Sequence, residues 1–244
     1  MRLPTWSEIE TKIRLDLDLQ DDSNFISQDE MAGLCNDAID AAEAIIMTTF
    51  EDYFLTYATL TMVQGASDIA LPSDIYAQKI REVLYKNGDR IFPLKELRDP
   101  MKFYKKAILD RESVSQDEYS YFLKSATAGE QDKLVLVPAA LESGAYLEMW
   151  YIRNANRIPL QTDSGSPSRA TQLATVIDIP EWRAYLEQFI KWRCYQKMKD
   201  QAGETTAAAA LEKFGELMLV NLKDKKLNNE NEIVMDVSHY MEHE

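Results

Sequence analysis

The clearest pattern of apolar and polar positions lies between residues 27 and 49. Apolar residues recur there at steps of three and four, which places them on one face of a helix with polar residues opposite. The apolar face consists of Met31, Leu34, Cys35, Ala38, Ile39, Ala42, Ile45 and Ile46, and the polar face of Asn36, Asp37, Asp40 and Glu43. Ser27 and Glu30 have the spacing of a capping box, so the helix begins there. We expect its apolar face to be buried.

The period changes from about 3.6 to two in residues 58–63, where Ala58, Leu60 and Met62 alternate with Thr59, Thr61 and Val63. Such alternation is typical of a half-buried strand. The next four residues are centred on Gly65 and favour a turn. A short partner strand over 68–71 then ends at Pro72, which has no N–H to donate to a ladder. The pattern predicts a hairpin.

This order of elements, closed by the phrase Leu71-Pro72-Ser73-Asp74, resembles the head-to-tail adaptors (connector or neck proteins) of tailed bacteriophages. The resemblance extends over most of the chain and rests on short phrases rather than on a catalytic signature. It implies a structural virion protein that forms a homo-oligomeric ring, commonly a dodecamer, beneath the portal. Its implied partners are the portal protein, a tail or nozzle protein and further copies of itself. DNA would pass through the ring during genome ejection without specific binding.

Helical patterns occur near both ends of the chain. A second capping box at Thr5 and Glu8 opens a short amphipathic helix. A capped start at Asp178, Pro180 and Glu181 opens another helix, which we expect to end at Gly203. A last helix is expected from about Thr205. The apolar faces of the three helices are Ile9, Ile13 and Leu17; Trp182, Tyr185, Leu186, Phe189 and Ile190; and Leu211, Phe214, Met218 and Leu222.

Strand patterns fill the middle. Residues 86–89 contain Asn87-Gly88, the preferred type I′ hairpin sequence. Asp99-Pro100 favours a short helix, whose Lys102, Lys105 and Lys106 we interpret as a solvated face. Strands over 119–124, 134–137 and 145–153, separated by turn residues, predict an antiparallel meander. Residues 161–171 are small and polar, so we expect a mobile loop.

These patterns together predict an α+β fold: a helical bundle formed by the N-terminal and C-terminal helices, with an inserted antiparallel β-rich region. The expected parts are the N-terminal helices of the bundle (1–56), the β-rich insertion (57–177), the C-terminal helical hairpin of the bundle (178–227) and an extended tail (228–244).

The charge balance disfavours tight binding to nucleic acid. The chain has 27 Lys and Arg against 41 Asp and Glu, a net charge of −14. A protein that grips DNA needs cations to neutralise phosphates. An acidic surface instead suits DNA that passes by without adhering.

Residues that would support catalysis or metal binding are sparse. We expect Cys35 and Cys194 to be reduced and packed, because neither has a Cys or His at ligand spacing. His239 and His243 stand four residues apart near the C-terminus without an HExxH glutamate. No nucleotide-binding glycine motif occurs. We therefore expect no enzyme activity, no cofactor and no metal.

The hydropathy of the chain indicates where the protein is located. The chain opens without an apolar signal region, and no apolar run approaches the roughly 18 residues of a membrane span. We expect no membrane association, with the protein in the host cytoplasm during assembly and at the portal vertex of the virion afterwards.

Aromatic residues in the predicted meander suggest a different class of function. A small-ligand or carbohydrate-binding module would use them as a platform, whereas packing within the sheet is the ordinary role of such residues. The residues in question are Tyr119, Tyr121, Tyr146, Trp150 and Tyr151.

The tail combines charge with apolar residues, and exposed apolar residues in a tail require a partner. We expect it to become ordered on the portal or on an adjacent subunit. The alternative is that the tail folds back on its own domain. The candidate partner-binding residues are Ile233, Val234, Met235, Val237 and Tyr240.

Overall fold

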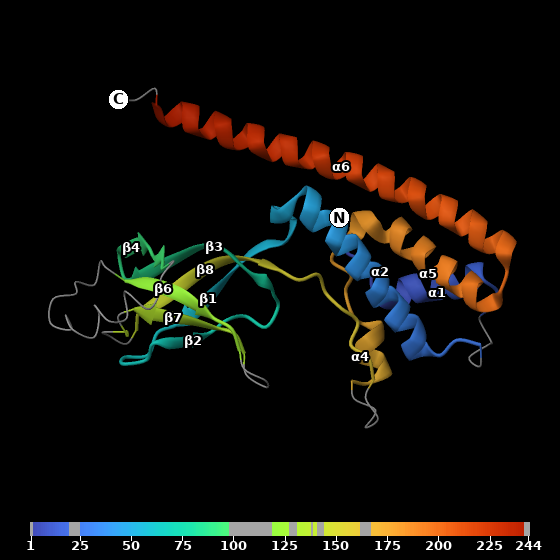
Figure 1. The fold of residues 1–244 in the computed structure, drawn as a ribbon, viewed down its shortest axis with the longest axis horizontal. Helices are drawn as coiled ribbons and strands as arrows, with labels where there is room; N and C mark the ends of the chain where they lie inside the picture. Colours follow the sequence, from blue (N-terminus) through green and yellow to red (C-terminus); the bar gives the residue numbers. More distant parts are fainter. Residues whose placement is uncertain are drawn as a thin grey trace. The chain divides into compact units, whose positions relative to one another are not determined.

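The computed structural model describes the backbone of seven ranges and the side chains as far as residue 226. The ranges are 2–19, 25–97, 119–126, 131–137, 139–140, 144–161 and 167–241. The chain forms two compact units: a helical unit of Met1–Tyr53 with Ala155–Glu244, and a β unit of Phe54–Asn154. Helices make up the first and two sheets the second, so the fold is α+β (Figure 1).

The helical unit contains the following helices, of which the short η1 leads the chain into the β unit. They are α1 (Trp6–Asp16), α2 (Gln28–Thr49), η1 (Glu51–Phe54), α4 (Arg169–Leu173), η3 (Pro180–Trp182), α5 (Arg183–Met198) and α6 (Gln201–Met241).

Helix α2 begins at the predicted cap, where the Ser27 hydroxyl accepts the Glu30 N–H at 3.0 Å. Its predicted apolar face is buried at Met31, Cys35, Ala38, Ile39, Ala42 and Ile46. The placement of Glu43 on the solvent face was wrong, since Glu43 is buried. Its carboxylate accepts the Ala155 N–H at 2.6 Å and binds Arg157 at 2.6 Å. A carboxylate this deeply buried is tolerated because both of its oxygens accept hydrogen bonds.

Helix α5 contacts α1, α2 and α6. It ends at Met198 rather than at Gly203, because Lys199 adopts the left-handed conformation, with φ of 58°. The Asp200 carboxylate then accepts the N–H groups of Ala202 and Gly203 at 3.2 and 3.1 Å, which allows α6 to begin at Gln201. Gly203 is therefore a residue of the first turn of α6.

Helix α6 continues to Met241, so the extended conformation predicted for residues 228–244 was wrong as far as Met241. An apolar stripe is not required for this continuation. A helix that has already nucleated adds one backbone hydrogen bond for each further residue.

The two glycines of α6 give a matched test of its packing. A Cβ at Gly203 would lie 2.5 Å from Tyr195 Cδ1, whereas the nearest atom at Gly215 is Tyr185 Cε2 at 3.8 Å. Alanine stabilises a helix interior over glycine by roughly 0.5–1 kcal/mol, and overpacking costs about 1–3 kcal/mol. Thermal unfolding followed by circular dichroism should therefore show a raised Tm for Gly215→Ala and a lowered Tm for Gly203→Ala. Equal stabilisation by both would contradict the close packing of Gly203 against Tyr195.

The β unit contains two four-stranded sheets, in the orders β1-β8-β3-β4 and β2-β7-β6-β5. All described neighbours pair antiparallel except β5 with β6, which pair parallel. The strands are β1 (Leu55–Thr61), β2 (Asp68–Ala70), β3 (Ile75–Asn87), β4 (Arg90–Pro93), β5 (Lys95–Glu96), β6 (Ser120–Lys124), β7 (Lys133–Val137) and β8 (Tyr146–Arg153).

Two predicted strand pairings were wrong. β1 and β2 do not form a hairpin, because β1 pairs with β8 and β2 with β7, in different sheets. The turn around Gly65 carries the chain from one sheet to the other, and the Gly65 N–H donates to the Ala140 carbonyl at 2.8 Å. The predicted meander is also interrupted: β6 and β7 are partners, but β8 lies between β1 and β3.

The hairpin of β3 and β4 was predicted correctly, with a different turn. Asn87 pairs with Arg90, so the two-residue loop is Gly88-Asp89. Only Gly88 of these has a positive φ, of 58°, as the first position of a type II′ turn requires.

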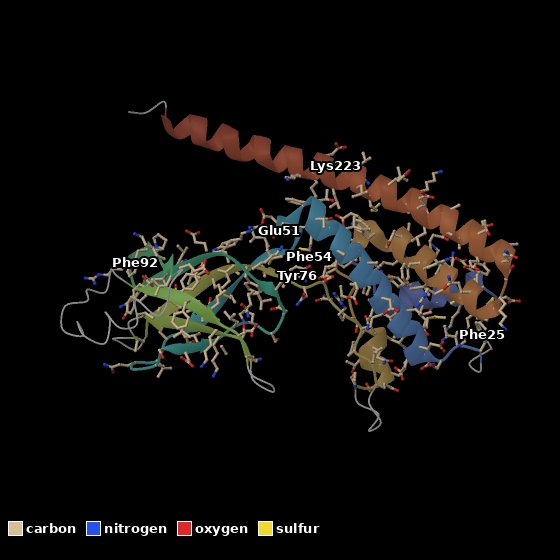
Figure 2. The ribbon with its side chains drawn as sticks, viewed as in Figure 1. Phe25, Glu51, Phe54, Tyr76, Phe92 and Lys223 are labelled. Atoms are coloured by element: carbon tan, nitrogen blue, oxygen red, sulfur yellow. The ribbon has the colours of Figure 1, made fainter. Side chains whose placement is uncertain are left out.

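The two sheets share one apolar core. Residues from both are buried in it, among them Val83, Leu134 and Leu147. Tyr85 stacks on Phe92 of β4 at 4.6 Å between ring centroids and on Tyr119 at 5.4 Å. Phe92 is labelled in the β unit in Figure 2.

The β unit ends at Asn154, not at the predicted residue 177. Residues after Asn154 are bound to helices of the helical unit: Asn36 of α2 donates to the Ile158 carbonyl at 2.9 Å and accepts the Ile158 N–H at 2.8 Å. Further on, Ile177 donates to the Pro4 carbonyl at 2.9 Å. The predicted loop over 161–171 includes the start of α4, capped by Ser168. The helix predicted after Asp99, with its three lysines, lies outside the described residues.

Candidate interaction surfaces

One face of the sheet β1-β8-β3-β4 is turned away from the core of the β unit. Antiparallel register places Tyr57 opposite Trp150, and Tyr146 opposite Lys86, which in turn is opposite Ile91. Tyr57 is 57% exposed and Ile91 59%. We call this set, with Glu148, the outer sheet face. It mixes aromatic and apolar side chains with a central ion pair.

Glu148 is the centre of that polar group. Lys86 Nζ lies 2.5 Å from its carboxylate, and Trp150 Nε1 donates to it at 3.0 Å. These two hydrogen bonds lower the pKa of Glu148, and the bond to Glu148 raises the pKa of Lys86. Both groups stay charged at neutral pH, so the ion pair fixes side chains on neighbouring strands.

The five aromatic residues of the predicted ligand platform do not share one surface. Tyr119, Tyr121 and Tyr151 are buried, and burial raises the pKa of both Tyr121 and Tyr151 to about 12. Only Tyr146 and Trp150 belong to the outer sheet face. Sequence reasoning missed Tyr57, which stands directly before the alternating stretch of residues 58–63 and whose ring lies 5.3 Å from that of Trp150.

A second exposed surface lies on α6, where Leu217 is 48% exposed and Val220 56%. Leu222, on another face of α6, is buried. Lys225 also holds α6 to the other helices: its Nζ lies 4.5 Å from the centre of the Tyr53 ring and 3.7 Å from the Glu181 carboxylate. Burial raises the pKa of Glu181, but the Tyr53 hydroxyl at 2.6 Å and Lys225 outweigh it and lower the pKa overall.

The predicted partner-binding residues Ile233, Val234, Met235, Val237 and Tyr240 all fall in the part of α6 after residue 226. The structure describes the backbone there and not the side chains. Their role therefore stays a prediction. His239 lies in the same stretch, and His243 lies outside the described residues.

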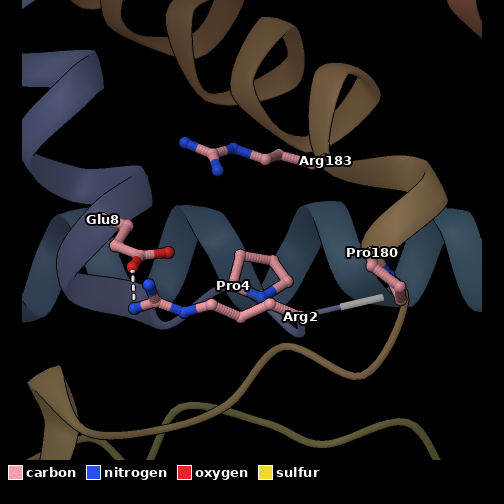
Figure 3. A pocket seen from close by; sticks show the side chains of 5 residues that line it. All are labelled: Arg2, Pro4, Glu8, Pro180 and Arg183. Carbon is pink, nitrogen blue, oxygen red and sulfur yellow. Dashed lines mark hydrogen bonds and ion pairs between the residues drawn. The ribbon is translucent and has the colours of Figure 1, made fainter.

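A pocket of about 490 Å³ lies between the start of α1 and the start of α5. Arg2, Pro4, Glu8, Pro180 and Arg183 line it, and both guanidinium groups lie toward Glu8 (Figure 3). Arg2 binds Glu8 at 2.6 Å, and Arg183 binds Glu187 of its own helix at 2.8 Å. The lining of this arginine pocket carries two positive charges and one negative charge.

The described residues contain no group of three or more His, Cys, Asp or Glu placed to hold a metal. Among them, no helix is long and apolar enough to cross a membrane. Cys35 and Cys194 are both buried free thiols whose pKa is raised by burial.

The α+β chain is a bacteriophage head-to-tail adaptor. It belongs to the SU10 adaptor protein family, whose model matches residues 4–230 and thus both units. A search of curated proteins finds no match.

Proposed function

We propose that the chain is one subunit of an adaptor ring that joins the portal to the tail or nozzle and leaves a channel for the genome. The family match over residues 4–230 carries this proposal. The ring would be a homo-oligomer, commonly a dodecamer in such adaptors. Its work is mechanical: it holds two larger structures together, at the portal vertex of the virion, after assembly in the host cytoplasm.

The helical unit supplies the body of each subunit in this proposal, as a bundle of N-terminal and C-terminal helices. The contacts of α5 with α1, α2 and α6 support it. Exposed residues on the outer sheet face and on α6 are then candidates for contacts with neighbouring proteins, because apolar side chains left in water favour association. The residues after 226, including Ile233 and Tyr240, would bind the portal or an adjacent subunit.

The assembly is tested by native mass spectrometry and negative-stain microscopy of the purified chain, alone and mixed with portal. We expect a ring of high mass that attaches to portal. A protein that stays monomeric with portal present, and that binds glycans, would instead favour the ligand-binding module. The burial of Tyr119, Tyr121 and Tyr151 disfavours that alternative, because it removes three of the five platform rings.

The charge of the chain yields a prediction about DNA. With a net charge of −14, the isolated protein should not retard duplex DNA in a gel at physiological salt, although DNA passes through the assembled ring. A salt-sensitive complex of submicromolar affinity would contradict a channel that DNA passes without adhering.

A further inference from the structure

The arginine pocket has hydrogen-bond donors suited to a carboxylate. A guanidinium carries five N–H donors, and its planar fork binds carboxylates through two parallel hydrogen bonds. Arg2 gives one of its nitrogens to Glu8, and Arg183 gives its Nε to Glu187, so each has further donors. The side chain of Arg2 is 83% exposed and that of Arg183 is 37% exposed, so an incoming group can reach both.

The chain itself contains a segment of complementary charge. From Leu227 onward it has no Lys or Arg. The same stretch has five acidic residues: Glu230, Glu232, Asp236, Glu242 and Glu244. The lining of the arginine pocket has a net charge of +1, although Arg2 and Arg183 are each paired with a carboxylate, and this acidic segment has the opposite sign.

The geometry of α6 carries the end of the helical segment away from the pocket of its own subunit. Lys225 contacts Glu181, which is next to Pro180 in the lining of the pocket. From there α6 runs on as a helix for residues 226–241, which moves its end about 24 Å away at 1.5 Å per residue. An arginine pocket that the end of this helix meets therefore belongs to a second copy.

We propose that the arginine pocket binds the acidic C-terminal segment of a neighbouring copy of this chain. The inference rests on the proposed ring, because a ring brings copies side by side. It deepens that function by naming the adjacent subunit as the partner of the segment. The contact is head-to-tail: each subunit contributes a pocket to one neighbour and a segment to the other, as closure of a ring requires.

The test is fluorescence anisotropy of a labelled peptide of residues 228–244 added to the full-length protein, diluted until native mass spectrometry shows monomers, so that no neighbour's segment fills the pocket. We expect saturable binding that weakens about tenfold for Arg2→Glu and for Arg183→Gln, because each removes a charge that faces the peptide. Lys213→Glu is the matched control: it reverses an exposed charge in the same unit, away from the pocket, and should leave the affinity unchanged.

Charge reversal in the peptide strengthens the test. A peptide with Glu242→Lys and Glu244→Lys should bind wild-type protein more weakly and the Arg2→Glu variant more tightly than the natural peptide does. Arg2→Glu keeps the experiment independent of folding, since that side chain is largely in solvent. Equal affinity for all variants, no saturable binding, or displacement of the peptide by duplex DNA would overturn the inference. The proposed function fails on a different result, the absence of a ring that attaches to portal.

Discussion

Replacing Ile39 by aspartate should prevent the chain from accumulating as a folded protein. Ile39 is fully buried on the apolar face of α2, the helix that α5 and α6 both contact. An unpaired carboxylate at such a site costs several kcal/mol, against a total stability of roughly 5–15 kcal/mol. The measurement is the yield of soluble protein, with circular dichroism of whatever remains in solution.

Two further variants of the same helix serve as controls. Ala44 is exposed, so Ala44→Asp should fold as the wild type does. Leu34 is half-buried, so Leu34→Asp should give an intermediate loss. If the Ile39 variant folded normally, the apolar face of α2 would not be part of the core.

Deleting residues 228–244 should leave a folded protein that no longer attaches to portal-bearing capsids. The contacts of α6 with η1 and η3 through Leu222 and Lys225 precede the deletion, so the Tm should stay near that of the wild type. A ring multiplies each weak contact through effective concentration, so losing the segment from every copy should weaken attachment at least about a hundredfold. Co-sedimentation with capsids measures it.

Replacing the same residues by a Gly/Ser segment of equal length is the control for chain length, and it should fail to attach as the deletion does. Docking of the truncated protein with unchanged affinity would show that attachment to portal does not need the segment, either directly or through the contacts between subunits. Unfolding of the truncated protein would show that the segment stabilises the subunit instead.

Local patterns in the sequence predicted the elements well where neighbours in the chain determine them. Ser27 and the apolar face of α2, and the Gly88 turn of the β3–β4 hairpin, depend on residues within a few positions. The pairing of β1 is not determined locally. Alternation of Ala58 and Leu60 with threonines indicates a strand with one buried face, but it does not indicate which strand lies beside it. The nearest strand in sequence was the wrong partner.

Glu43 shows the same limit for a single side chain. It has the spacing of a solvent-facing residue, and its partners Ala155 and Arg157 stand more than a hundred residues later. The arginine pocket was missed for the same reason, since Arg2 and Arg183 stand far apart in the chain. The apolar residues of the C-terminal segment were recognisable from the sequence, but its helical backbone was missed, although Ile233, Val237 and Tyr240 recur at steps of four and three.

The pairing of β1 with β8 has a consequence for how such a chain can change. Leu55 stands opposite Ile152, so the chain enters and leaves the β unit on two hydrogen-bonded neighbouring strands. Only a tight turn would be needed to connect these two strands directly. The β unit is therefore an insertion that can be shortened, enlarged or exchanged during evolution without changing the path of the helices. Adaptors built this way are free to keep one helical body while the inserted sheets diversify with whatever they meet.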